Sequence, residues 1–168
     1  MKKSISFLLA FLVILSLLPM SVFAESDVPS ISVKSTCASP NSTVDVALLV
    51  ENNPGITASS IMITFDEGLT LVGATAGDAF SALTMTPPRQ LSTIGSITGS
   101  CRFAWFSSDI EEEDIKDGTI LTLTFEVSED VSLNEDYMIS VSCEDGDTVG
   151  KDGNAMPINT GNGYISII

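Results

Sequence analysis

Alternation of apolar and polar residues with a period of two is the feature that most limits how this chain can fold. Within residues 43–52 every second side chain from 44 to 50 is Val or Leu, and within 119–128 every second one from 121 to 127 is Leu, Phe or Val. This pattern is typical of strands with one buried face, because a slip of one residue would expose the whole apolar set. No segment keeps a 3.6-residue period for more than about two turns. The sequence therefore predicts an all-β protein with little helix.

Turn residues fall between the alternating runs, for example Asn53-Pro54-Gly55, Asp117-Gly118 and Asn162-Gly163. Together they predict an antiparallel β-sandwich of eight or nine strands, with any helix confined to 76–83. The expected strands are 31–37, 43–52, 57–66, 69–75, 84–94, 99–108, 119–128, 137–143 and 163–168.

Residues 1–24 have the order of a secretory signal peptide: Lys2 and Lys3, an apolar run over 7–18, and a small residue, Ala24, at the end. The alternative is a membrane anchor, but the run reaches only about 18 Å as a helix against a hydrocarbon core of about 30 Å. We therefore expect cleavage after Ala24 and a soluble, secreted, extracellular product consisting of one domain, 25–168.

Composition excludes several kinds of site. The chain has no histidine, which rules out Ser-His-Asp and Cys-His catalysis and every His-ligated zinc or copper site. Five basic and 22 acidic residues follow residue 24, a balance that repels nucleic acid and anionic lipid. Cys37, Cys101 and Cys143 form an odd set, so at least one thiol stays unpaired within the chain. Either all three are small core or strand residues, or two form a bridge.

Three stretches, in order and in register, carry a resemblance to a known family. They are Gly55-Ile56 with Ile61–Asp66 and Leu69–Val72, then Trp105–Asp109 with Ile115–Phe125, then Gly161–Ile167. In this order the chain resembles cohesin domains over essentially all of 30–168. The resemblance implies a nine-stranded jelly-roll β-sandwich that is not an enzyme.

The resemblance also implies a partner. Cohesins bind dockerins, small calcium-loaded helical modules of secreted enzymes that degrade plant polysaccharides, and they do so as scaffold components of cellulosomes. Calcium would then belong to the dockerin, with no cofactor on this chain, and contact with polysaccharide would be indirect. The type of dockerin is left open.

Carried over by position, the family's contact face uses the outward side of the third expected strand, which is Ala58, Ser60 and Met62 here. Many cohesins have Asn and Asp where this chain has Ala58 and Ser60, so two hydrogen-bonding side chains are missing. The inward side would then consist of Ser59, Ile61, Ile63 and Phe65.

On the sixth expected strand the same register turns Cys101, Phe103 and Trp105 outward, with Ala104 and Phe106 inward. Phe103 and Trp105 would then form an apolar plateau of the kind that anchors protein interfaces. The alternative is that Phe103 or Trp105 belongs to the core.

Further candidates surround this plateau. Ser108, Asp109 and Glu111 lie at one end, where the acidic stretch 111–114 could meet basic side chains of a partner or form a solvated loop. Arg89, with Gln90, comes from the fifth expected strand, which Pro87-Pro88 makes irregular.

Three other functions compete with the family reading. A carbohydrate-binding module shares the architecture but needs coplanar aromatic rings, and the chain has only one Trp and two Tyr. A glycosidase needs two carboxylates at a fixed separation, whereas the acidic residues here gather in turns. A calcium-stabilised adhesin would use Asp145, Asp147, Asp152 and Asn154, which are equally consistent with a plain acidic turn.

Overall fold

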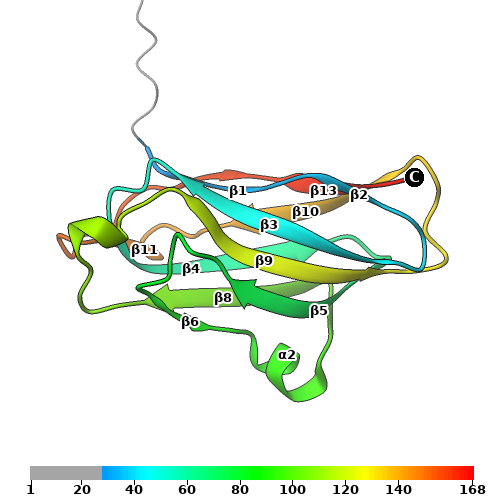
Figure 1. The fold of residues 1–168 in the computed structure, drawn as a ribbon, viewed down its shortest axis with the longest axis horizontal. Coiled ribbons are helices and arrows are strands. Elements are labelled where there is room, and N and C mark those ends of the chain that lie inside the picture. The colour runs from blue at the N-terminus through cyan, green and yellow to red at the C-terminus, as the bar shows by residue number, and fades with distance from the viewer. Residues whose placement is uncertain (1–27) are drawn as a thin grey trace, which may run out of the picture.

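Two β-sheets packed face to face make up the part of the protein that the computed structural model describes, residues 28–168 (Figure 1). Sheet A has six strands, in the order β12 (Asn159–Gly161), β1 (Ser30–Val33), β3 (Thr43–Glu51), β9 (Gly118–Val127), β5 (Leu69–Ala76) and β7 (Ile97–Thr98). Sheet B has seven: β2 (Thr36–Ala38), β13 (Gly163–Ile167), β10 (Asp136–Ser142), β4 (Ile56–Phe65), β8 (Ser100–Phe106) and β6 (Thr84–Thr86), with β11 (Thr148–Gly150) pairing beside β10 along β4. The all-β sandwich predicted from the sequence is confirmed.

The core lies between the sheets and is built from the alternating residues of the long central strands. In sheet A, Leu48 lies opposite Leu121 and Val46 opposite Leu123 across the β3–β9 pair, and all four are fully buried. Side chains from sheet B pack against those of sheet A. Phe65 of β4, for example, makes a T-shaped contact with Phe125 of β9, with ring centroids 5.0 Å apart. Burying such a side chain stabilises the fold by about 1.5–3 kcal/mol, which fixes the register of both strands.

The region between β5 and β8 differs from the prediction. The strand expected at 84–94 ends at Thr86, because Pro87 and Pro88 have no backbone N–H to continue a ladder. A short helix, α2 (Arg89–Ile94), follows instead, and Gly95 ends it in the left-handed conformation at φ 83°. Figure 1 shows α2 outside both sheets.

The helix expected at 76–83 is also wrong. These residues form turns after β5, and the backbone N–H groups of Gly77 and Ala79 donate to the carbonyls of Ile120 and Thr119. The turns insert the side chain of Phe80 into the core, where it is 2% exposed. The sequence pattern indicates that the apolar residues here are buried, but it does not indicate that they enter the core from a loop.

The strand boundaries differ in smaller ways as well. The expected strand 31–37 divides into β1, in sheet A, and β2, in sheet B, and the short strands β7, β11 and β12 were not expected. Residues 28–168 thus contain 13 strands where nine were predicted. The expected leader and its cleavage site after Ala24 lie outside the described residues. Within the described part of the chain, no helix has the length and apolar character needed to cross a membrane.

Candidate functional site

The outer face of sheet B, centred on β4 and β8, carries the residues that the sequence singled out on the third strand. Ala58, Ser60 and Met62 point outward and are half-buried, whereas the intervening Ser59 and Ile61 are buried. The predicted orientation of this strand is confirmed.

The predicted orientation of β8 is wrong. Cys101, Phe103 and Trp105 are buried at 6%, 0% and 2% exposure, so they face the core and form no outward plateau. Pairing with β4 gives the reason, because Phe103 lies opposite the inward Ile61 and Trp105 opposite the inward Ser59. Directly opposed residues of antiparallel strands share a face of the sheet. The alternative, that Phe103 and Trp105 are core residues, is the correct one.

Arg102, Ala104 and Phe106 therefore form the outer side of β8, although the sequence pattern had assigned Ala104 and Phe106 inward. Phe106 is 59% exposed and lies opposite Ala58 on β4 and Thr84 on β6. Ala104 lies opposite Ser60 in the next row. Around β4, β8 and β6 the face thus has one large exposed ring with small side chains beside it, a shape that lets a flat partner surface approach closely. Met138 on β10 and Tyr164 on β13 are also exposed on the outer face of sheet B, where they lie opposite each other.

Arg102 is the centre of a charged cluster on this face. Its Nη1 donates to Ser60 Oγ and to Asp147 Oδ2, both at 3.0 Å, and its Nη2 donates to Glu144 Oε1 at 3.2 Å. Hydrogen bonding to Asp147 is the main reason that the pKa of Arg102 is raised. This cluster was not expected from the sequence. The signal for Arg102 was available, because a charged residue in a strand points away from the core.

The loop after β8 begins beside Phe106 and contains Ser108, Asp109 and Glu111, all exposed. Glu111 forms a reciprocal capping box with Asp114 around the 3₁₀ turn η1 (Glu112–Asp114). Glu112 is paired with Lys151. The acidic stretch is thus an ordered turn at the end of β8. One of its carboxylates, that of Glu112, is already paired with a lysine of the same chain.

Arg89 lies on α2 instead of on a strand of the face, so its predicted position is wrong. The helix follows β6, the edge strand next to β8. Arg89 is exposed there, and the helix packs on β5 and β7 of sheet A.

Beneath the face, Trp105 packs in an aromatic cluster. Its ring meets Phe80 edge-on at a centroid distance of 5.8 Å and stacks on Phe103 at 6.1 Å. The indole Nε1–H is buried and has no acceptor among the described residues. A buried donor without a partner reduces stability, since it loses its hydrogen bonds to water.

The three cysteines are all free thiols in the structure, so no bridge forms. Cys37 is exposed, Cys143 is half-buried, and Cys101 is buried in the core. Burial raises the pKa of Cys101 to about 12, which keeps its thiol neutral and unreactive. Cys101 is thus a core residue and Cys37 a strand residue of β2, as the first alternative expected, whereas Cys143 follows the end of β10.

The acidic residues that a calcium-stabilised adhesin would use do not converge on one point, because they bond to different partners within the protein. Asp147 faces Arg102, while Asp152 accepts hydrogen bonds from the backbone and side-chain nitrogens of Asn154. The Asn154 side chain is the main cause of the lowered pKa of Asp152. Within residues 28–168 no group of three or more Asp, Glu, Cys or His side chains is arranged to hold a metal ion.

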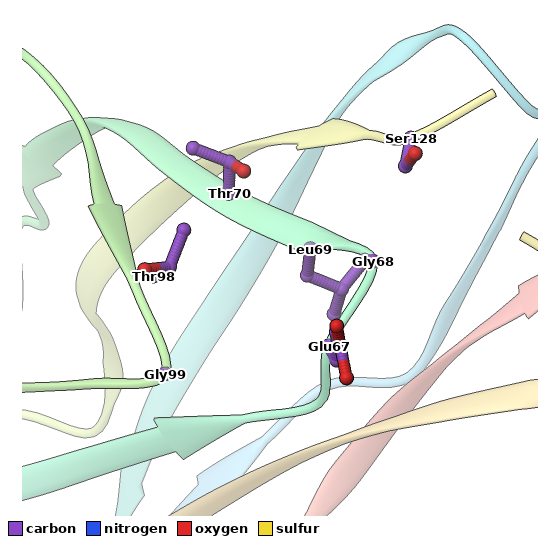
Figure 2. A pocket seen from close by; sticks show the side chains of 7 residues that line it. All are labelled: Glu67, Gly68, Leu69, Thr70, Thr98, Gly99 and Ser128. Atoms are coloured by element: carbon purple, nitrogen blue, oxygen red, sulfur yellow. The ribbon is translucent and has the colours of Figure 1, made fainter. Parts of the chain in front are cut away.

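A hollow of about 520 Å³ lies at the other end of the sandwich from Phe106, where the turn before β5 meets the turn before β8 (Figure 2). It is lined by Glu67, Gly68, Leu69, Thr70, Thr98, Gly99 and Ser128. The lining offers hydroxyls and one carboxylate but no aromatic ring. This hollow therefore lacks the stacking platform that the carbohydrate-binding alternative requires.

Comparison with protein families matches residues 29–167 to the model of the cohesin domain. The comparison with curated proteins gave no match. The family match spans both sheets and includes all the strands of the candidate face.

Solved structures with the same fold include a non-cellulosomal cohesin from the archaeon Archaeoglobus fulgidus, 16% identical, with a TM-score of 0.69 over 84% of this chain and 91% of that chain. A type III cohesin module from the cell-surface anchoring scaffoldin ScaE of Ruminococcus flavefaciens is 20% identical, with a TM-score of 0.68 over 89% and 92%. A type I cohesin–dockerin complex from Clostridium thermocellum is 20% identical, with a TM-score of 0.62 over 84% and 99%. At these identities the likeness concerns the fold.

Proposed function

Since the chain belongs to the cohesin domain family, we propose that it is an exported protein-binding module that captures dockerin-bearing, polysaccharide-degrading enzymes in a cellulosome-type assembly. The leader-like sequence of residues 1–24 supports export. Calcium would be carried by the dockerin, and the chain would act by binding, without catalysis of its own.

The observation that carries the proposal is the exposed ring of Phe106 on the outer face of sheet B. A large aromatic side chain 59% exposed, with Ala58 and Ala104 around it, is what the centre of a protein interface requires. Half-buried Met62, beyond Ser60 on the same side of β4, adds a second apolar side chain to the face. The solved relatives include cohesins in complex with dockerins, which supports the same kind of partner here.

Polar groups on β4 and in the loop after β8 complete the proposed contact surface. Ser60 lies beside Ala104, and Ser108, Asp109 and Glu111 follow Phe106 in the loop beyond β8. Such groups contribute mainly to specificity and association rate, while the desolvated centre supplies most of the affinity.

The test is a calorimetric titration of residues 25–168 with a panel of dockerins in calcium and again in chelator. Soluble cellulose and xylan oligosaccharides are run beside them. We expect a heat signal from at least one dockerin that disappears in chelator, and none from the sugars. Sugar binding without any dockerin response would instead assign the chain to the carbohydrate-binding class.

A further inference from the structure

Arg102 is the only cationic residue in the strands of sheet B, and its side chain is already bonded to other residues of this protein. Its guanidinium extends from β8 across Ser60 on β4 to the turn that connects β10 to β11. There it bonds to one oxygen of Glu144 and one of Asp147. A single side chain thus joins two strands and a turn on the outer face.

The cluster keeps an excess of negative charge after this internal pairing, because one guanidinium faces two carboxylates. Glu144 is 79% exposed and Asp147 is 29% exposed. Among the hydrogen bonds of residues 28–168, Glu144 Oε2 and Asp147 Oδ1 have no partner. Each carboxylate therefore still has an oxygen free to accept a bond from outside.

The backbone of the turn is fastened independently of Arg102. The N–H of Ser60 donates to the Asp147 carbonyl at 3.0 Å, and the N–H of Asp147 donates to the Glu144 carbonyl at 3.0 Å. Removing the guanidinium would leave the turn attached to β4. The effect of Arg102 is therefore on where the two carboxylates point.

We propose that Arg102 is a positioning residue of the docking face, which holds the carboxylates of Glu144 and Asp147 ready for a basic side chain of the dockerin. This inference rests on the proposed function and deepens it by naming the charge of the partner at this place. Charge complementarity supports it, because the domain is strongly acidic and its only sheet B cation is neutralised from within. A lysine or arginine beside the cluster would balance the remaining negative charge, whereas a carboxylate would have to displace one that is already bonded.

The experiment compares Arg102→Gln and Glu144→Gln with the wild type, using the dockerins of the panel that bind the wild-type protein. Association rates and affinities are measured by surface plasmon resonance at low and at high salt. Glu126→Gln is the matched control for Glu144→Gln, since Glu126 is an exposed acid on β9 of the opposite sheet. Lys34→Gln is the matched control for Arg102→Gln, because Lys34 is an exposed cation between β1 and β2.

Glu144→Gln should lower the association rate at low salt by about three- to tenfold and weaken its salt dependence, while Glu126→Gln changes it far less. Arg102→Gln should also weaken binding, although it makes the protein more negative, because the carboxylates lose their position. Lys34→Gln should not weaken binding. Denaturation curves for each variant show that the fold is retained.

With a dockerin that binds the wild type, three results would overturn the inference. Tighter binding by Glu144→Gln would mean that the partner is acidic at this place. Weaker binding by Glu144→Gln combined with tighter binding by Arg102→Gln would mean that Arg102 only opposes a basic partner and positions nothing. Wild-type binding that neither variant changes would remove the cluster from the interface. Absence of any dockerin binding by the wild type would contradict the proposed function itself, and the inference with it.

Discussion

Trp105 offers the sharpest test of the corrected strand orientation, through two substitutions with opposite expected results. Trp105→Ala removes a side chain that is 2% exposed and packs on Phe80 and Phe103. Loss of a buried large aromatic typically costs about 3–5 kcal/mol, which is a large part of the roughly 5–15 kcal/mol that stabilises a domain. We expect a strongly destabilised protein.

Trp105→Phe keeps a six-membered ring and removes the indole N–H that has no acceptor among the described residues. Two fewer buried carbons cost about 1.6 kcal/mol at about 0.8 kcal/mol each. Removing a buried unsatisfied donor returns about 1–3 kcal/mol. The two contributions nearly cancel, so the free energy of unfolding should stay within about 1.5 kcal/mol of the wild-type value.

The assay is urea unfolding followed by circular dichroism, because both variants lack the only tryptophan and give no indole fluorescence. Two results would refute the reasoning. A Trp105→Ala protein as stable as the wild type would mean that the ring is not core. A loss above about 2 kcal/mol in Trp105→Phe would mean that the indole N–H has a bonded partner.

Three further predictions concern other parts of the molecule. Phe106→Ala should leave the unfolding midpoint unchanged but weaken dockerin binding by about 2 kcal/mol, roughly 30-fold, in a calorimetric titration, and unchanged affinity would remove this ring from the interface. Because burial raises the pKa of Cys101 from 9.0 to about 12, its neutral thiol stabilises the fold fully below pH 9.0, and this contribution is lost as pH rises toward 12. The stability of the wild type relative to Cys101→Val should then fall by about 1.4 kcal/mol per pH unit across that window in urea unfolding, and a constant difference would contradict the burial argument. Gly77→Ala would place a Cβ 2.1 Å from the Thr119 carbonyl oxygen, so we expect a loss of about 1–3 kcal/mol in thermal unfolding, whereas a neutral result would mean that the turn shifts freely.

The two strands at the centre of the face show why sequence patterning succeeded on one and failed on the other. On β4, Ile61, Ile63 and Phe65 alternate with a threonine and a methionine that end up outside, so burial of the larger apolar set determined the orientation. On β8, Phe103 and Phe106 lie on opposite sides, and a period of two cannot choose between sides that are both apolar.

Contacts between distant segments account for what the sequence missed. Arg102 alone distinguished the two sides of β8, since its charge belongs on the solvent side. Its partners Glu144 and Asp147 come from a turn more than 40 residues later, which meets β4 only because β11 replaces β10 along that strand. No local pattern in the sequence predicts a contact between residues so far apart along the chain. Similarly, Phe80 enters the core from a turn, where neither the two-residue period of a strand nor the 3.6-residue period of a helix applies.

The central claim is that the outer face of sheet B, around Phe106, is the surface that binds a dockerin. Backbone amide chemical shifts of residues 25–168, recorded by NMR while a calcium-loaded dockerin is added, test it most directly. We expect the largest changes on Ala58, Ala104 and Phe106, and no change on the outer side of β3 and β9 in sheet A. Changes concentrated on Thr122 and Thr124 of β9, with β4 and β8 silent, would contradict it.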